Sequence, residues 1–267
     1  MRFVKMHGNG NDFVMFDEFY KILVPEKEKP AFVRAICHRN FGVGGDGAIF
    51  VQKSNIANAK FRYFNSDGSE AAMCGNGIRC FARYVVEEGY AKEGRVKVET
   101  LAGIIDIDVW KDRRWWIRVN MGKVDYLWCR EMEINGKRYV VHATKAGVPH
   151  AVIFVEDLDF EIVPDARIIR YHSLFPEGTN VNFVKVDGKK LYIRTYERGV
   201  EAETLSCGSG SVASAFVARK LSLVDEVVEV QTKGGILIVE LKDTAYMIGS
   251  ANRVFEGEIR EDELHKI

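Results

Sequence analysis

The chain has 267 residues, 47% of them hydrophobic, and its 38 basic side chains balance 38 acidic ones, so the formal net charge is zero. This length allows two compact domains, and the neutral balance provides no basic surface for nucleic acid. No stretch approaches the ~20 apolar residues of a membrane span, and the first residues lack the apolar segment of a signal peptide.

In chain order, the hydrophobic pattern predicts many strands and few helices. Helical spacing predicts helices over residues 30–39, from Cys74 to Gly89, over residues 164–172 and from Cys207 to Leu221. Period-two alternation predicts half-buried strands over residues 96–100, 104–109, 114–119, 137–142 and 191–196. Asn135-Gly136 and Asp187-Gly188 are hairpin signals between such strands.

One sequence pattern occurs twice. Residues 70–77 read E-x-x-x-C-G-x-G, and residues 203–210 read the same, 133 positions later. Residues 98–105 resemble 230–237, residues 46–51 align with 180–185, and 11–14 align more weakly with 150–153. A period near half of the chain is far longer than the repeat of a solenoid. It indicates a duplicated domain, whereas chance matches would not keep one order and nearly one offset.

The duplication predicts the fold class. Each half contains several strands and two helices, and the longer helix of each half begins at the glycine-flanked cysteine. The small residues Ala213, Ser214 and Ala215 suit a helix packed inside a curled sheet. We therefore predict an α+β fold of two pseudo-symmetric domains, each a curled, mainly antiparallel sheet around a central helix.

Cys74 and Cys207 are the candidate catalytic residues. A helix N-terminus has unpaired N–H groups and a partial positive charge, and both favour a thiolate. The glycines after each cysteine let a ligand approach these donors, and a carboxylate is the obvious guest. If the carbon beside that carboxylate loses a proton, the donors stabilise the enolate that forms. Two thiols facing one carbon from opposite sides could therefore remove a proton and return one.

Other readings of the cysteines are weaker or apply elsewhere. Five cysteines without C-x-x-C spacing argue against a disulfide framework and against zinc, and they fit a reducing cytoplasm. Cys37, Cys80 and Cys129 lack flanking glycines, and we interpret them as buried packing residues. For Cys74 and Cys207, a redox pair that forms a disulfide is the main alternative.

The chain resembles the diaminopimelate epimerase family over nearly its whole length. The resemblance is carried by these segments: 5–8, 10–13, 42–46, 64–70, 74–80, 120–122, 149–150, 178–183, 196–199, 203–204 and 207–210. Proline racemases share the wider fold group and also use paired cysteines. The M-C-G-N-G and Y-E-R-G runs, at Met73 and Tyr196, favour the epimerase.

The resemblance implies a cofactor-independent, two-base epimerisation of LL- and meso-2,6-diaminopimelate for lysine and peptidoglycan synthesis, and a homodimer. It implies two domains, residues 1–118 completed by about 254–267, and residues 119–253. Cys74 and Cys207 look like the acid–base pair. The remaining substrate-binding candidates fall into three groups: donors to the reacting carboxylate (Gly75, Asn76, Gly208, Ser209), contacts that fix the substrate (Asn11, Asn65, Asn180, Arg198), and groups near the reacting centre (His150, Glu197).

Three positions depart from the family pattern. Gly47 stands where many members have Gln, Val148 replaces an Asn two residues before His150, and one extra residue lies between Glu197 and Cys207. With Val148 there is one fewer buried polar group to reject analogues. We therefore expect relaxed specificity toward lysine or other amino acids that lack the second carboxylate.

Several alternatives remain open. They are an amino-acid racemase of the proline racemase type, a thiol redox protein and a binding module of this fold. A pyridoxal-phosphate racemase would need a Schiff-base lysine. The G-x-G-x-x-G run at 42–47 lies after a predicted helix, which is the reverse of the dinucleotide-binding context.

Overall fold

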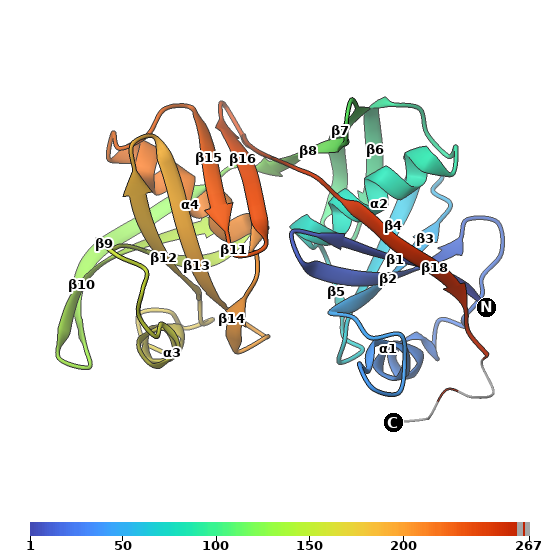
Figure 1. The fold of residues 1–267 in the computed structure, drawn as a ribbon, viewed down its shortest axis with the longest axis horizontal. Coiled ribbons are helices and arrows are strands. Elements are labelled where there is room, and N and C mark those ends of the chain that lie inside the picture. The colour runs from blue at the N-terminus through green and yellow to red at the C-terminus, as the bar shows by residue number, and fades with distance from the viewer. Residues whose placement is uncertain (261–263, 265–267) are drawn as a thin grey trace. The chain divides into compact units, whose positions relative to one another are not determined.

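The computed structural model describes residues 1–260 and residue 264 (Figure 1). The chain divides into two compact units, residues 1–119 with 249–267, and residues 120–248. Within the described residues no helix is long and apolar enough to cross a membrane.

Unit 1 is a sheet in which a crossover helix connects each parallel strand pair. Its strands are β1 (Arg2–Gly8), β2 (Asn11–Glu18), β3 (Gly47–Gln52), β4 (Ala59–Asn65), β5 (Glu70–Ala71), β6 (Gly94–Thr100), β7 (Gly103–Lys111), β8 (Trp115–Gly122) and β18 (Asn252–Glu258). The pairs β2–β3 and β4–β6 are parallel, and β1–β2, β3–β4, β4–β5, β6–β7 and β7–β8 are antiparallel. A parallel pair needs a long crossover, which α1 (Lys29–Cys37) supplies for the first and α2 (Gly75–Glu87) for the second.

Unit 2 repeats this pairing order strand for strand. Its strands are β9 (Asp125–Ile134), β10 (Lys137–Ala146), β11 (Val148–Phe154), β12 (Asn180–Asp187), β13 (Lys190–Glu197), β14 (Ala202–Thr204), β15 (Val227–Thr232), β16 (Gly235–Leu241) and β17 (Ala245–Gly249). Here β11–β12 and β13–β15 are parallel, with α3 (Val163–Arg170) and α4 (Gly208–Lys220) as crossovers. The predicted α+β fold with an internal duplication is confirmed.

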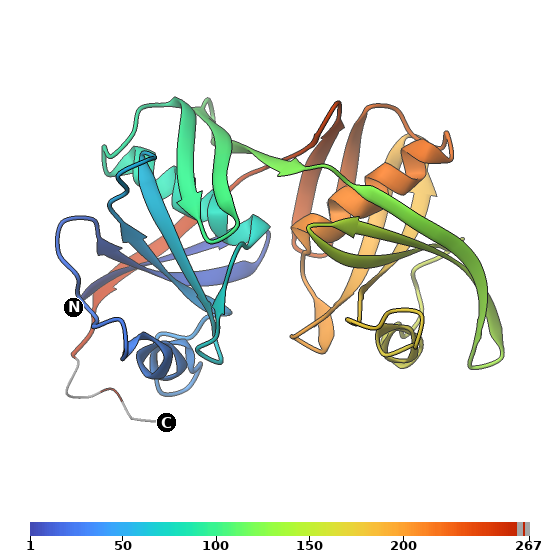
Figure 2. The same cartoon turned by 180° about the vertical axis from the view of Figure 1, so that it is seen from behind.

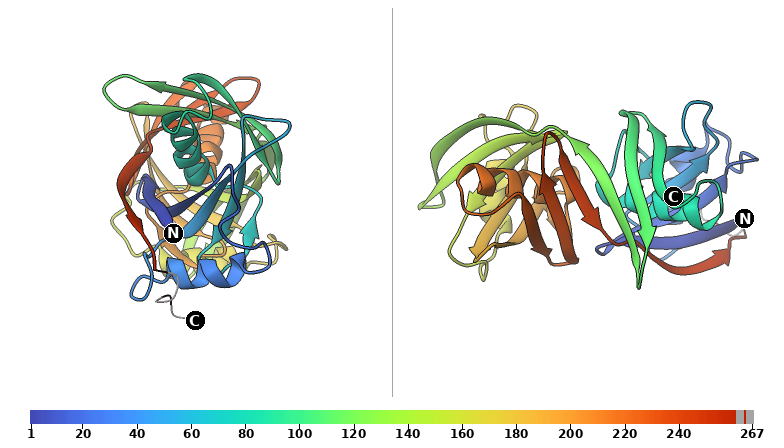
Figure 3. Two further views of the ribbon diagram at one scale, coloured as in Figure 1. Left: turned by 90° about the vertical axis from the view of Figure 1, so that its right-hand side faces the viewer. Right: turned by 90° about the horizontal axis from the view of Figure 1, so that it is seen from above.

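The chain returns to its beginning through β18. This strand pairs antiparallel with β1, from Arg2 opposite Glu258 to His7 opposite Asn252, and the two lie side by side in Figure 3 (right). Of the C-terminal stretch expected to complete the first domain, residues 261–263 and 265–267 lie outside the described residues.

The two long helices are enclosed by the strands of their own unit. α4 contacts β10, β11, β12, β13, β15 and β16, and Figure 2 shows it (orange) against those strands. Its Ala213, Ser214 and Ala215 are fully buried, as predicted. A helix covered on all sides needs small or apolar residues all round, and each buried Val or Phe contributes roughly 1.5–3 kcal/mol. α2 is enclosed in the same way, with fully buried Phe81 and Val85.

The local predictions hold with small shifts. The four predicted helices and five predicted strands are all present, with ends displaced by a few residues. Asn135 and Gly136 both have positive φ in the β9–β10 turn, as the hairpin signal indicated. In the second hairpin, however, Asp187 pairs with Lys190, so the turn residues are Gly188 and Lys189 rather than Asp187 and Gly188.

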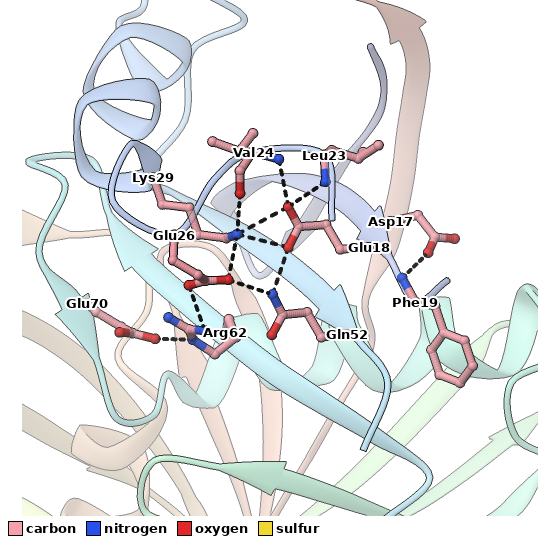
Figure 4. Close-up of polar contacts among 10 residues, drawn as sticks. All are labelled: Asp17, Glu18, Phe19, Leu23, Val24, Glu26, Lys29, Gln52, Arg62 and Glu70. Carbon is pink, nitrogen blue, oxygen red and sulfur yellow. Dashed lines mark hydrogen bonds and ion pairs between the residues drawn. The ribbon is translucent and has the colours of Figure 1, made fainter. Parts of the chain in front are cut away.

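A buried polar cluster fastens α1 to the sheet of unit 1 (Figure 4). Lys29, fully buried, donates to the carbonyl of Val24 at 2.7 Å and forms ion pairs with Glu18 at 3.0 Å and Glu26 at 2.9 Å. Gln52 on β3 donates to Glu18 at 2.7 Å. Since every member has partners, the desolvation cost of these charges is offset by charge-assisted hydrogen bonds. The cluster therefore fixes the position of α1, from whose end residues 38–46 lead to β3.

Candidate active site

Cys74 is the N-cap residue of α2. Its backbone is extended, with φ −138° and ψ 117°, and its sulfur accepts the N–H of Gly77 at 3.4 Å. The half-buried side chain therefore lies at the positive end of the helix, where free N–H groups gather. Gly75 is the first helical residue, and Asn76 follows it.

Two further predicted residues of unit 1, Asn11 and Asn76, form one hydrogen-bonded group with Cys74. The thiol of Cys74 donates to Asn11 Oδ1 at 3.8 Å, and Asn76 Nδ2 donates to the same oxygen at 3.3 Å. Asn11 Nδ2 donates to the Asp46 carboxylate at 2.7 Å. The Asn11 amide is thus held between β2, the segment before β3, and the start of α2.

The buried guanidinium of Arg79 orients the Asn76 amide. Arg79 on α2 is fully buried and donates to Asn76 Oδ1 at 3.0 Å and Asn9 Oδ1 at 2.7 Å. Burial lowers the pKa of Arg79 to about 10, so it remains charged at neutral pH. Its interactions turn the donor end of the Asn76 amide toward Asn11.

A pair of half-buried carboxylates, Asp12 and Asp46, supports Asn11. Arg39 bridges Asp12 at 3.0 Å and Asp46 at 2.7 Å, and Lys5 pairs with Asp12 at 2.6 Å. Burial opposes ionisation of Asp12, but its hydrogen bonds with Arg39 and Lys5 prevail and lower its pKa to about 2. Asp12 therefore stays ionised and keeps the strand end in place.

In unit 2, Cys207 is the N-cap residue of α4. It is 6% exposed, with φ −118° and ψ 111°. Its sulfur lies 3.6 Å from Ser209 Oγ, and Ser209 Oγ lies 3.0 Å from His150 Nε2. His150 is fully buried on β11, and burial, followed by the charge of Arg198, lowers its pKa to about 3. The imidazole is therefore neutral, and the structure brings these three predicted residues together.

Three other predicted residues of unit 2 lie where β12 begins and β13 ends. Asn180 Oδ1 accepts the backbone N–H of Arg198 at 2.8 Å, and Asn180 Nδ2 donates to the Pro149 carbonyl at 3.3 Å. Arg198 Nη1 donates to the Glu177 carbonyl at 3.0 Å. Half-buried Glu197 is the last residue of β13, so Glu197 and Arg198 open the loop that leads back to Cys207.

The loop that carries the extra residue between Glu197 and Cys207 is bonded to α3 through Glu201. Glu201 has positive φ, 57°, and accepts from Arg170 on α3 at 2.8 and 3.1 Å and from the N–H of Gly199 at 3.0 Å. A Cβ on Gly178 would lie 1.6 Å from the Arg170 guanidinium. Because residue 178 is a glycine, the Arg170 side chain has room to reach the loop.

Asn65 is not bonded to the Cys74 group. Its Oδ1 accepts from the Tyr63 hydroxyl at 2.8 Å, and its Nδ2 donates to Ser69 Oγ at 3.0 Å. The neighbouring departure, Gly47, is explained by the same ring. A Cβ there would meet the Phe64 carbonyl at 2.4 Å and the Tyr63 ring at 2.6 Å, so Gly47 makes room for the tyrosine that holds Asn65.

The remaining cysteines are in part as predicted. All five cysteines are free. Cys37 and Cys80 are buried, and burial raises the pKa of each to about 12, so both are inert thiols. Cys129 is exposed, and its predicted burial was wrong. Trp128 and Met132 of β9 pack on the core, and strand alternation turns Cys129 to the other face.

Two residues that sequence reasoning missed complete the polar groups. Arg79 on α2 stands between the apolar residues Ile78 and Cys80, and Asn182 on β12 stands between Val181 and Phe183. Both polar side chains are fully buried. A polar residue in an otherwise apolar buried run is the signal that would have singled them out. Within the described residues, no group of three or more His, Cys, Asp or Glu side chains is placed to hold a metal ion.

Comparison with known proteins identifies the family. The family model described as diaminopimelate epimerase matches residues 3–127 and 142–254. A diaminopimelate epimerase of Archaeoglobus fulgidus is 60% identical, with 98% of this chain and 97% of that protein covered. One of Methanothrix thermoacetophila is 50% identical, with 100% and 99% covered.

Solved structures share the fold at low identity. A phenazine biosynthesis protein of the PhzF family from Bacillus anthracis has a TM-score of 0.77 at 16% identity, covering 97% of this chain and 99% of that one. A hydroxyproline epimerase from Agrobacterium vitis has a TM-score of 0.73 at 15% identity, covering 96% and 91%. These likenesses show the two-domain α+β fold. With the family model matching both units and relatives that are 60% and 50% identical spanning the chain, this protein belongs to the diaminopimelate epimerase family.

Proposed function

We propose that this protein is an isomerase that interconverts LL- and meso-2,6-diaminopimelate without a cofactor. The observation that carries the proposal is the duplicated cysteine: Cys74 and Cys207 each cap the central helix of a unit, and each has a polar side chain beside its sulfur. Full-length similarity to proteins named diaminopimelate epimerase supports this substrate.

The proposed chemistry is a proton exchange at the α-carbon. One cysteine, as thiolate, takes the α-proton, and the electron pair of the C–H bond passes into the adjacent carboxylate. The other cysteine, as thiol, gives its proton to the opposite face, so the two sulfurs exchange protonation states in each turnover. N–H groups at the helix N-termini stabilise the enolate, because they are in place before the charge develops.

The other predicted substrate-binding side chains divide the remaining tasks. The substrate is held in position by Asn11, Asn65, Asn180 and Arg198. Arg198 suits a carboxylate because its guanidinium can form a bidentate pair of hydrogen bonds with it. His150 and Glu197 lie near the reacting carbon, and neutral His150 adds no positive charge that would compete with the substrate ammonium.

Heavy-water exchange tests the proposal. Incubation of the purified protein with LL-diaminopimelate in D₂O, with no added cofactor, should incorporate deuterium at the α-carbon as the meso form appears. Cys74→Ala and Cys207→Ala should each lose at least a thousandfold in epimerisation, the scale expected for a reacting group. Cys129→Ala, which removes an exposed thiol, is the control. Near-normal turnover by either active-site variant would refute the two-base mechanism.

The biological setting is part of the same proposal. We infer a role in lysine and peptidoglycan precursor synthesis, in the cytoplasm and as a homodimer. Sedimentation equilibrium of the purified protein should give twice the chain mass of 30.3 kDa. A monomer would remove the dimer from the proposal and leave the chemistry untouched.

A further inference from the structure

Asn65, a proposed substrate ligand, is the last residue of β4, and the turn that follows fixes its backbone. Its N–H donates to the Ser69 carbonyl at 2.8 Å, and the N–H of Gly68 donates to the Asn65 carbonyl at 2.9 Å. The turn rests on the segment that begins α1, since a Cβ on Gly68 would lie 2.4 Å from the Pro30 carbonyl oxygen. What remains to be controlled is the rotation of the Asn65 side chain.

The orientation of the Asn65 amide is determined from Asp67. Hydrogen bonds from Ser69 lower the pKa of Asp67, so it is a carboxylate at neutral pH and can only accept. Asp67 accepts the Ser69 hydroxyl at 2.6 Å. A serine hydroxyl has one hydrogen, so Ser69 Oγ must accept in its bond with Asn65, 3.0 Å away. The end of the amide that faces Ser69 is therefore the donor, Nδ2.

The hydroxyl of Tyr63 holds the other end of the amide. It donates to Asn65 Oδ1 at 2.8 Å, and the two residues share a face of β4 because they are two positions apart. The Tyr63 ring is 6% exposed and packs edge-on against Phe13, with centroids 5.8 Å apart. Gly47 stands opposite Asn65, and a Cβ there would lie 2.6 Å from the ring. Packing therefore places the hydroxyl, and the hydroxyl then holds the amide.

Half of the hydrogen-bond capacity of this amide stays available. A side-chain amide has two N–H hydrogens and two oxygen lone pairs. Among the described contacts, Ser69 takes one hydrogen and Tyr63 takes one lone pair. The remaining N–H and lone pair suit a substrate with a carboxylate and an ammonium group. A rotated amide would exchange the places of donor and acceptor, so binding depends on the orientation.

We propose that Tyr63 is a positioning residue for substrate binding, whose hydroxyl keeps the Asn65 amide in the orientation that the substrate requires. The proposal rests on the proposed function only where it makes Asn65 a substrate ligand. An amide that is ordered before binding costs less entropy when the substrate arrives. The hydroxyl should therefore contribute to substrate affinity rather than to the proton transfer.

Steady-state kinetics of Tyr63→Phe test this role, since the variant keeps the ring and removes the hydroxyl. KM for diaminopimelate should rise about fivefold, the weight of one ordinary hydrogen bond, while kcat changes less than twofold. Tyr84→Phe is the matched control, because Tyr84 is a buried tyrosine of the same unit whose hydroxyl donates to Asp17 at 3.1 Å. It should leave KM unchanged. An unchanged KM in Tyr63→Phe would overturn the proposal.

A double-mutant cycle distinguishes positioning from a general structural effect. If Tyr63 acts through Asn65, adding Tyr63→Phe to Asn65→Ala should leave KM where Asn65→Ala alone puts it. The same fivefold rise in both backgrounds would contradict the proposal. Ser69→Ala is a second variant, should Tyr63→Phe not fold. It changes an exposed residue and removes the acceptor of Asn65 Nδ2, so KM should rise in the same direction.

Nuclear magnetic resonance of the substrate-free protein tests the orientation without any turnover. The side-chain amide signal of Asn65 is assigned by its loss in Asn65→Ala, and its ¹⁵N heteronuclear NOE is compared between proteins. The NOE should fall in Tyr63→Phe and stay at the natural value in Tyr84→Phe. An NOE that is equally high in Tyr63→Phe would show that the hydroxyl does not hold the amide, whether or not the protein epimerises diaminopimelate.

Discussion

The guanidinium of Arg194 on β13 binds the carboxylate of Glu203 on β14 through two hydrogen bonds of 2.7 Å. Unit 1 has the same pair at the same place, Arg62 on β4 with Glu70 on β5. Each glutamate is the first residue of the repeated E-x-x-x-C-G-x-G pattern and precedes its cysteine by four residues. The repeated glutamate therefore fastens the strand that leads into the N-cap cysteine.

Breaking this pair should loosen the Cys207 segment. Both side chains of the Arg194–Glu203 pair are mostly buried, so Arg194→Met leaves a carboxylate with only Lys233 at 2.8 Å. We expect a loss of about 1–3 kcal/mol in unfolding free energy, measured by urea denaturation, and a lower kcat. Arg194→Lys should recover part of the loss, because lysine keeps the charge without the fork.

The control for that variant is an exposed pair of the same unit. Lys189 and Asp225 lie 3.3 Å apart with 62% and 71% of their side chains exposed. Lys189→Met should change stability by less than about 1 kcal/mol. If the two variants lose equally, the Arg194 pair has no special role in fixing the segment.

His150 predicts a specific acid sensitivity. Its pKa is about 3 in the folded protein and near 6.5 when unfolded. Its contribution is therefore complete above pH 6.5 and is lost as the pH falls toward 3, because only the unfolded chain takes up the proton. The loss is about 1.4 kcal/mol per pH unit, or roughly 2–3 kcal/mol between pH 6.5 and 4.5.

The measurement compares the natural protein with His150→Gln in chemical denaturation across that range. Burial also lowers the pKa of His7 and His142, so both proteins lose stability on acidification. The difference between their slopes isolates His150, and parallel pH profiles would contradict its buried, neutral state.

The second glycine of each repeated motif should tolerate substitution differently. A Cβ on Gly210 would lie 2.3 Å from Asn182 Oδ1, whereas one on Gly77 finds its nearest neighbour, Ile49, at 3.3 Å. Gly210→Ala should cost about 1–3 kcal/mol through overpacking and should displace Asn182. Gly77→Ala is the matched variant in unit 1, and it should cost less. Denaturation of both proteins gives the comparison, and a larger cost for Gly77→Ala would contradict it.

The Glu201 anchor should act on substrate binding more than on folding. Arg170→Leu removes the two hydrogen bonds that α3 donates to the Glu201 carboxylate, and this loop carries the proposed substrate ligands Glu197 and Arg198. We expect KM for diaminopimelate to rise about tenfold, equivalent to about 1.4 kcal/mol, with a smaller fall in kcat. An unchanged KM would show that the loop keeps its position without the anchor.

Val148 should relax substrate selectivity. It is half-buried at the start of β11, two residues before His150, where the family pattern has an Asn. A site rejects an analogue strongly when binding it would leave a buried polar group of the site unpaired. With Val148 the site has one fewer such group. We expect measurable racemisation of L-lysine, and Val148→Asn should reduce it relative to diaminopimelate epimerisation. Lysine turnover below one-thousandth of the diaminopimelate rate would contradict the expectation.

Much of the fold and of the candidate site was readable from local patterns. The C-G-x-G motif after an extended residue, followed by apolar helical spacing, places a cysteine at a helix N-cap, since local backbone geometry alone produces that arrangement. The repeat of this motif at Cys74 and Cys207 predicted the duplicated units. The burial of single residues was harder to predict. Cys129 was expected to be a buried packing residue, but the alternation along β9 turns it outward.

The sequence by itself determined that this chain contains two cysteine-capped helices in duplicated α+β units. Only the tertiary structure decided how each sulfur is surrounded, because the deciding partners come from segments distant in the chain: His150 on β11 for Cys207, and Asn11 on β2 with Asp46 before β3 for Cys74. A motif specifies a backbone conformation over a few residues. The hydrogen bonds around each sulfur depend on groups that meet only when the sheet closes around its helix.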